Sequence, residues 1–236
     1  ASGPRVTLEG ELAGSRLPDP GLRGTGIRVF DPVSGQEVAS SRAYSVDLEL
    51  RPLFEKRVVV ERLRAEWMRF QAAGGRQVAV PSLELSGFEP GSETSISVGL
   101  GPFGEVDGNF TWYPERSGLD VSLSWSMPER EPVRLDGRFT YRADGAVFDG
   151  FRLAVAEQAV EGSGCFLSVP APRLDVELEA GRLDLDRIQS ALDFGAGGGD
   201  GLPIELNARL RAEELVRGGV EASGVVLEYG ARPDCP

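Results

Sequence analysis

Apolar and polar residues alternate with a period of two along much of the chain. Residues 119–127 read LDVSLSWSM, which places five apolar side chains on one face of an extended strand and four polar ones on the other. Residues 173–180 and 204–211 repeat the pattern, with carboxylates or alternating charges between the apolar positions. A helix would spread these apolar residues around its axis, whereas a strand collects them on one side. The pattern predicts β-strands.

Less regular alternation predicts further strands, most of them bounded by Gly, Pro, Asp or Ser, which suit short turns. These strands are expected at residues 5–12, 26–30, 44–50, 58–67, 77–85, 94–100, 105–112, 133–141, 148–155, 160–169 and 220–229. Asp-Gly pairs that begin at Asp107, Asp136, Asp144 and Asp149 are expected to supply positive-φ residues for turns or bulges.

Helical signals are few. Residues 183–192 carry apolar side chains at helical spacing, and Asp184 is placed to cap the helix. Residues 51–56 favour a single turn, with Pro52 near its first position. Residues 195–201 are rich in glycine and predict a flexible linker or a long loop.

Strands with one apolar face close as a sandwich, as a barrel or as a trough. Composition alone favours the sandwich, but several runs of eight or nine alternating residues are longer than usual strands. The apolar positions also hold Leu, Val, Phe and Trp without recurrent small residues that would let two sheets interlock. We therefore predict an all-β fold with minor α: an elongated, curled antiparallel sheet that forms an open, taco-like groove. An exposed apolar groove marks a binding site.

Composition narrows the chemistry. A net charge of −12 disfavours nucleic acid and electrostatic docking on an anionic membrane. The chain has no histidine, which removes the commonest general base and zinc nitrogen ligand, so we predict no enzyme, no metal and no cofactor. Cys165 and Cys235 are either a disulfide in an oxidising compartment or two unrelated thiols, and the sequence leaves both open. No signal peptide or membrane span is visible, so any anchor is expected outside this chain.

Two stretches carry a family resemblance. The first comprises residues 5–12, 21–30, 43–54 and 58–63, with a "valine–polar–leucine–polar–leucine–x–proline–leucine" element inside it. The second comprises residues 172–180, 182–188, 204–215 and 218–228, with a "leucine–aspartate–leucine–aspartate" helix start and a glycine pair before the last strand. Together they cover roughly half the chain, and they resemble AsmA-like proteins of the bacterial envelope.

The resemblance implies a bridge-like β-groove protein, periplasmic and anchored in the inner membrane, that binds phospholipid or another acyl-chain lipid and contacts envelope proteins. It implies transport of lipid between inner and outer membranes or outer-membrane homeostasis. Residues 1–194 would be the groove segment, 195–201 the linker, and 202–236 the final, shortened strands. The predicted lining comprises Val46, Leu48, Phe110, Trp112, Leu119, Val121, Leu123, Trp125, Met127, Phe139, Tyr141, Phe151, Leu153, Val155, Leu174, Val176, Leu178, Ile204, Leu206 and Leu210.

Other interpretations stay open at this point. The same residues would fill the closed core of a structural, assembly or adhesin-like β-sandwich that carries no ligand. Trp112 and Trp125 would suit a carbohydrate-binding module. Asp184 and Asp186 resemble a metal or acid–base pair, although helix capping explains both better.

Overall fold

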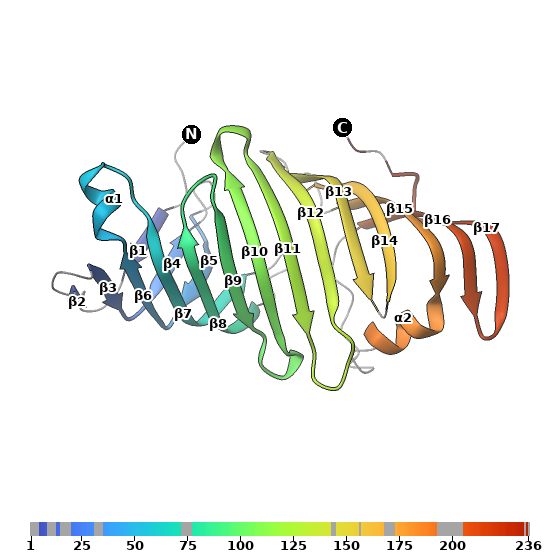
Figure 1. Ribbon diagram of the computed structural model, residues 1–236, viewed down its shortest axis with the longest axis horizontal. Coiled ribbons are helices and arrows are strands. Elements are labelled where there is room, and N and C mark those ends of the chain that lie inside the picture. Colours follow the sequence, from blue (N-terminus) through green and yellow to red (C-terminus); the bar gives the residue numbers. More distant parts are fainter. Residues whose placement is uncertain are drawn as a thin grey trace. The chain divides into compact units, whose positions relative to one another are not determined.

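Figure 1 shows the computed structural model of the chain, which describes residues 5–8, 13–14, 20–30, 35–71, 77–142, 145–155, 157–167, 173–192, 205–233 and 235. The chain folds as two units, residues 1–111 and residues 112–236. The predicted linker at residues 195–201, Ile204 and Asp144 lie outside the described residues. The domain boundaries predicted from the sequence stay a prediction.

Unit 1 is an antiparallel sheet with one short helix. Its elements are β1 (Arg5–Leu8), β2 (Ala13–Gly14), β3 (Gly21–Gly24), β4 (Ile27–Phe30), β5 (Glu37–Ser41), β6 (Ala43–Leu48), α1 (Leu50–Phe54), β7 (Val60–Gln71), β8 (Gln77–Phe88), β9 (Glu93–Gly99), a 3-10 turn at Gly101–Phe103, and most of β10 (Glu105–Tyr113). Strands β7, β8, β9 and β10 pair in sequence order. Both β5 and β6 pair with β7, and β4 and β3 pair with β5 and β6 respectively. The short strands β1 and β2 pair with β4 and β3.

Unit 2 is also a β-sheet with one short helix. After a 3-10 turn at Pro114–Arg116 its elements are β11 (Gly118–Ser126), β12 (Val133–Arg142), β13 (Gly145–Val155), β14 (Gln158–Leu167), β15 (Arg173–Asp184), α2 (Leu185–Leu192), β16 (Glu205–Arg217) and β17 (Val220–Tyr229). Strands β11 to β15 form an antiparallel meander. Strand β17 pairs antiparallel with β16.

One pairing in unit 2 departs from the predicted antiparallel order. Strands β15 and β16 are parallel, with Leu174 beside Leu206 and Leu178 beside Leu210. Parallel neighbours need a crossover of a dozen or more residues, commonly with a helix. Helix α2 lies between the end of β15 at Asp184 and the start of β16 at Glu205, as such a crossover requires.

The predicted all-β fold with an open antiparallel sheet and two short helices is confirmed. Within each unit, the pairings among the described strands make one sheet, and none of them joins its first strand to its last. A closed sandwich needs two facing sheets. The described strands of each unit make a single layer, so the sandwich is the wrong architecture for either unit.

Two details of the sequence prediction are wrong. Gly108 and Gly137 lie inside β10 and β12 with no positive φ, because an extended strand continues through both. Among the Asp-Gly pairs that the structure describes in full, Asp149 and Gly150 form a bulge, where the register shifts between Phe148 and Phe151. Small residues are also present on the apolar side of unit 2: Gly162 stands opposite Leu178, and Gly164 stands opposite Val176.

Candidate functional site

One face of the sheet in unit 2 is apolar across every strand. On β11 and β12, Leu119 stands opposite Phe139 and Leu123 stands opposite Leu135. Because side chains alternate along a strand, the register carries the same face through β13 to β17. We call it the apolar face of unit 2; its residues are Leu119, Val121, Leu123, Trp125, Val133, Leu135, Phe139, Phe148, Phe151, Leu153, Val155, Val160, Phe166, Leu174, Val176, Leu178, Leu206, Leu210 and Leu227.

The opposite face of unit 2 is ionic. Arg138 Nε donates to Asp120 Oδ1 at 2.7 Å, across β11 and β12. Arg152 pairs with Glu161 across β13 and β14 at 3.3 Å, and similar pairs follow on the later strands. The hydrogen bond from Arg138 holds the pKa of Asp120 below its ordinary value. This face is therefore suited to water, which makes the apolar face the candidate binding surface.

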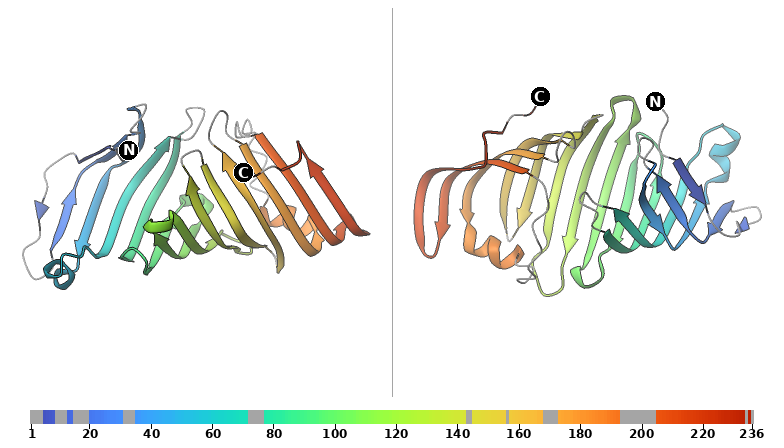
Figure 2. Two further views of the ribbon diagram at one scale, coloured as in Figure 1. Left: turned by 90° about the horizontal axis from the view of Figure 1, so that it is seen from above. Right: turned by 180° about the vertical axis from the view of Figure 1, so that it is seen from behind.

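The apolar face of unit 2 is only partly shielded. Figure 2 shows β11 to β17 lying side by side, and most of the apolar side chains on them are half-buried. Leu206 is 39% exposed and Leu227 is 43% exposed. Full burial of the larger side chains on this face is local: Val133 and Val155 form a small core with Met127, against which Trp125 and Leu153 pack. Elsewhere on this face, neighbouring side chains on the same sheet cover each apolar side chain in part. The remaining apolar area is exposed and could be covered by an apolar ligand.

Aromatic rings fill the middle of this face. The ring centroids of Phe139 and Phe148 lie 5.2 Å apart, and those of Phe148 and Phe151 lie 6.4 Å apart, both in edge-to-face arrangements. A Cβ atom at Gly162 would lie 3.0 Å from Phe151 Cζ and 2.9 Å from Leu178 Cδ2. The side chains of Phe151 and Leu178 therefore occupy the space next to Gly162. The small residue accommodates large side chains of the same sheet and not a second sheet.

Unit 1 has an apolar face of its own. Val46 on β6 stands opposite Leu63, which in turn stands opposite Leu85 on β8. Ile96 is the partner of Leu85 on β9, and the rings of Phe88 and Phe110 lie 6.3 Å apart. All of these side chains are half-buried.

The predicted lining residues divide by unit. In unit 1, Val46 and Phe110 lie on the apolar face and Leu48 is half-buried opposite Val60. In unit 2, the structure brings most of the predicted residues together on one face; Met127 is instead buried in the small core, and Tyr141 is 51% exposed. Trp112 is half-buried near the start of unit 2. The role of these residues in binding lipid stays a prediction.

Sequence reasoning missed several members of the apolar faces. Each of those on unit 2 belongs to a run that was predicted as a strand; they are Val133, Leu135, Phe148, Val160, Phe166 and Leu227. These residues could have been predicted from the alternation. In a strand, every second residue lies on the same face, so the residues two positions from a predicted lining residue share its face. On unit 1, strand β5 (Glu37–Ser41) was not predicted at all, since its five residues are too polar to show a pattern.

A disulfide joins Cys165 to Cys235, which decides between the two alternatives left by the sequence. It holds the segment after β17 over the ionic face of β14 to β16. Asp175, 1% exposed beneath that segment, pairs with Arg173 at 2.9 Å and accepts a hydrogen bond from Asn207 Nδ2 at 2.7 Å. Asn207 Oδ1 accepts from the backbone N–H of Ala231 at 2.8 Å. The side chains of Asp175 and Asn207 therefore have polar partners, and both sulfurs form the disulfide, so we interpret the cluster as structural.

The carboxylates near α2 are structural as well. Asp184 Oδ1 accepts from the backbone N–H groups of Asp186 and Arg187 at 3.0 and 3.1 Å, which confirms it as the helix cap. Asp186 Oδ2 accepts from the N–H of Gly218 in the turn between β16 and β17. The two carboxylates therefore have separate backbone partners.

Comparisons with protein-family models, with curated proteins and with solved structures found no match to this chain. Among the described residues, neither α1 nor α2 has the length and apolar character needed to cross a membrane. The site must accordingly be interpreted from its own geometry: an apolar surface backed by an ionic one.

Proposed function

We propose that this chain is a segment of a periplasmic β-groove that binds phospholipid acyl chains and shields them from water. The proposal includes a contribution to lipid transport between inner and outer membranes, or to outer-membrane homeostasis. The observation that carries it is the apolar face of unit 2, which runs across seven strands, from β11 to β17, without a second sheet over it within that unit.

The energetics support a surface of this kind. Each buried methylene is worth about 0.8 kcal/mol, so an acyl chain of about 16 carbons costs roughly 13 kcal/mol to carry uncovered through water. A lining of Leu, Val and Phe side chains removes most of that cost by contact alone. The ionic face behind it keeps the sheet hydrated, and the mechanism requires no catalytic residue.

Two further observations support the location. The sequence resembles AsmA-like proteins in the segments quoted above, and those proteins are periplasmic and anchored in the inner membrane. The disulfide between Cys165 and Cys235 suits an oxidising compartment such as the periplasm. We propose the same location for this chain, with membrane contact through residues outside it.

The test is mass spectrometry of organic extracts from the purified protein. We expect glycerophospholipid to copurify in an amount comparable to the protein, well above that in extracts of an unrelated periplasmic β-protein purified in the same way. Lipid at the level of that control protein would contradict the proposal. It would favour the alternative of an assembly or structural module that uses the same apolar faces to contact protein.

A further inference from the structure

Four residues that lack a ladder partner, Gly26, Arg42, Trp67 and Pro81, form a row across neighbouring strands of unit 1. Gly24 pairs with Tyr44 and Ile27 pairs with Ser41, so the unpaired Gly26 stands opposite Arg42. By the same register Arg42 stands opposite Trp67, because Ala43 pairs with Glu66 and Ser40 pairs with Arg69. Glu66 and Met68 pair with Ser82 and Val80, which leaves Trp67 opposite Pro81. The register is unchanged on both sides of this row, so the irregularity is shared by neighbouring strands.

The row shifts the alternation of side chains by one residue. On β7, Leu63 and Ala65 face the apolar side before the row, and Met68 and Phe70 do so after it. Trp67 absorbs the shift with φ at 50°, in the left-handed region that bulky residues rarely adopt. Such conformations persist where the surrounding structure imposes them, often at ligand sites. Trp67 is also 56% exposed, so the strained residue presents an indole to solvent.

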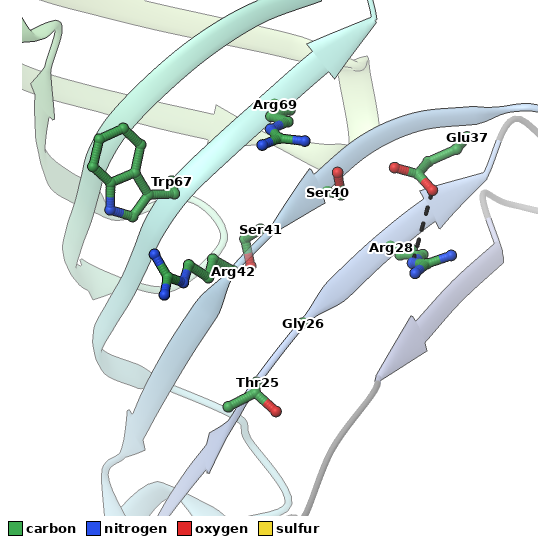
Figure 3. A pocket seen from close by; sticks show the side chains of 9 residues that line it. All are labelled: Thr25, Gly26, Arg28, Glu37, Ser40, Ser41, Arg42, Trp67 and Arg69. Carbon is green, nitrogen blue, oxygen red and sulfur yellow. Dashed lines mark ion pairs between the residues drawn. The ribbon is translucent and has the colours of Figure 1, made fainter.

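The row opens a hollow of about 660 Å³ on the polar side of β4, β5 and β7, which is within the range of small-molecule sites. Figure 3 shows the side chains that line it. Arg28, Arg42 and Arg69 contribute three positive charges against the single carboxylate of Glu37. Hydroxyl groups of Thr25 and Ser40 add hydrogen-bonding capacity at its wall.

The three arginines of the hollow differ in whether they form an ion pair. Arg28 Nε lies 3.8 Å from Glu37 Oε2, the ion pair drawn in Figure 3. Within the part of the chain that the structure describes, the guanidinium groups of Arg42 and Arg69 have no hydrogen bond or ion pair. This contrasts with Arg62 and Arg64 on the same strand, β7, which both pair with Glu84. In a chain of net charge −12, a hollow with excess positive charge is selective for anions.

We propose that this hollow binds the phosphate group of an anionic ligand, held by Arg42 and Arg69, with the Trp67 indole against its organic part. Guanidinium groups match phosphate oxygens in geometry, and their hydrogen bonds to an anion are charge-assisted. The site lies on the opposite face from the apolar lining of unit 1, and it does not depend on lipid binding there. A soluble phosphorylated compound and the headgroup of a membrane lipid share this chemistry.

The test compares Arg42→Gln/Arg69→Gln with the control Arg23→Gln/Arg51→Gln. All four arginines are exposed in unit 1, and the control removes the same charge from β3 and α1, outside the hollow. Glycerol 3-phosphate is titrated by tryptophan fluorescence, and phosphatidylglycerol vesicles are assayed by sedimentation beside phosphatidylcholine vesicles. The ionic strength is about 0.15 M, where screening beyond about 8 Å suppresses non-specific attraction. Circular dichroism checks that each variant is folded; if the double variant melts early, the single variants carry the test.

We expect wild type and control to bind alike, and the hollow variant to lose about tenfold or more in affinity. Binding of glycerol 3-phosphate identifies a soluble source, and binding to phosphatidylglycerol vesicles alone identifies a headgroup; either supports the site if Arg42 and Arg69 are required. Trp67→Phe should abolish the fluorescence change, although Trp112 and Trp125 remain. Equal losses in both double variants, or no binding of either probe by wild type, would overturn the proposal.

Discussion

Leu123 on β11 stands directly opposite Leu135 on β12, and their neighbours Ser122 and Asp136 stand opposite each other on the other face. Ser122 Oγ donates to Asp136 Oδ1 at 2.6 Å. A single register thus places apolar partners together on one side of the sheet and hydrogen-bonded partners on the other. A slip of one residue would exchange the two faces, so the apolar and the polar partners favour the same register.

Gly162→Ala should destabilise unit 2. The new Cβ would lie 2.5 Å from the carbonyl oxygen of Glu177, a backbone atom that cannot move aside cheaply, and 3.0 Å from Phe151 Cζ. We expect a loss of about 1–3 kcal/mol in the free energy of unfolding, measured by urea titration. Gly181→Ala on β15 is the matched control, because nothing lies within 4 Å of its Cβ position. Equal stability of the two variants would contradict the packing described for the apolar face.

Reduction of the disulfide should destabilise the folded chain. Cys165 and Cys235 are 70 residues apart, and the chain-entropy account assigns about 4 kcal/mol to closing such a loop. We expect Cys235→Ser to lower the urea midpoint, and dithiothreitol to lower the wild-type midpoint by a similar amount. Dithiothreitol should leave Cys235→Ser unchanged. A wild-type midpoint that is insensitive to the reductant would show that the bridge does not stabilise the protein.

The ion pair between Arg138 and Asp120 should give a pH-dependent contribution. Because the pKa of Asp120 is lowered in the folded state, the stabilisation is complete above the ordinary aspartate pKa of about 3.9. It is lost as the pH falls through the lowered pKa. We expect Arg138→Gln to lower the free energy of unfolding slightly at pH 7, as for other exposed pairs, and progressively less below pH 4, as measured by urea titration.

The control for that ion pair is Arg134→Gln, on the same strand and the same face of β12. It removes an identical charge, and Arg134 has no ion pair with any residue that the structure describes, so its effect on the free energy of unfolding should be smaller at pH 7. A pH-independent difference between the two variants would contradict the assignment of the effect to Asp120.

Part of this fold could be predicted from the sequence. The alternation in residues 119–127 predicts β11 and identifies its apolar side, because the period of two is a local property of the backbone. The capping role of Asp184 could also be predicted, since a cap acts on backbone groups two and three residues away. Both successes concern interactions between near neighbours in the chain.

The remainder depends on pairings between distant residues. Strands β15 and β16 are parallel, and local alternation predicts each strand without giving the direction of its neighbour. The disulfide required the segment after β17 to return across β14, 70 residues earlier. The basic hollow collects Gly26, Arg42 and Trp67 from separate strands, and only the sheet register brings them into one row.

The central claim is that the apolar face of unit 2 binds acyl chains, and Leu123→Asp compared with Ser124→Asp tests it most directly. Both variants add one carboxylate to β11, but Ser124 faces the ionic side opposite Arg134. Leu123 is half-buried, so we expect Leu123→Asp to remain folded. An acyl chain that covered the new carboxylate would bury a charge, which is costly. We therefore expect this variant to lose about tenfold or more of its copurifying phospholipid, measured by mass spectrometry. Ser124→Asp should keep the wild-type amount. Equal lipid in the two variants, or global unfolding of Leu123→Asp alone, would contradict the account.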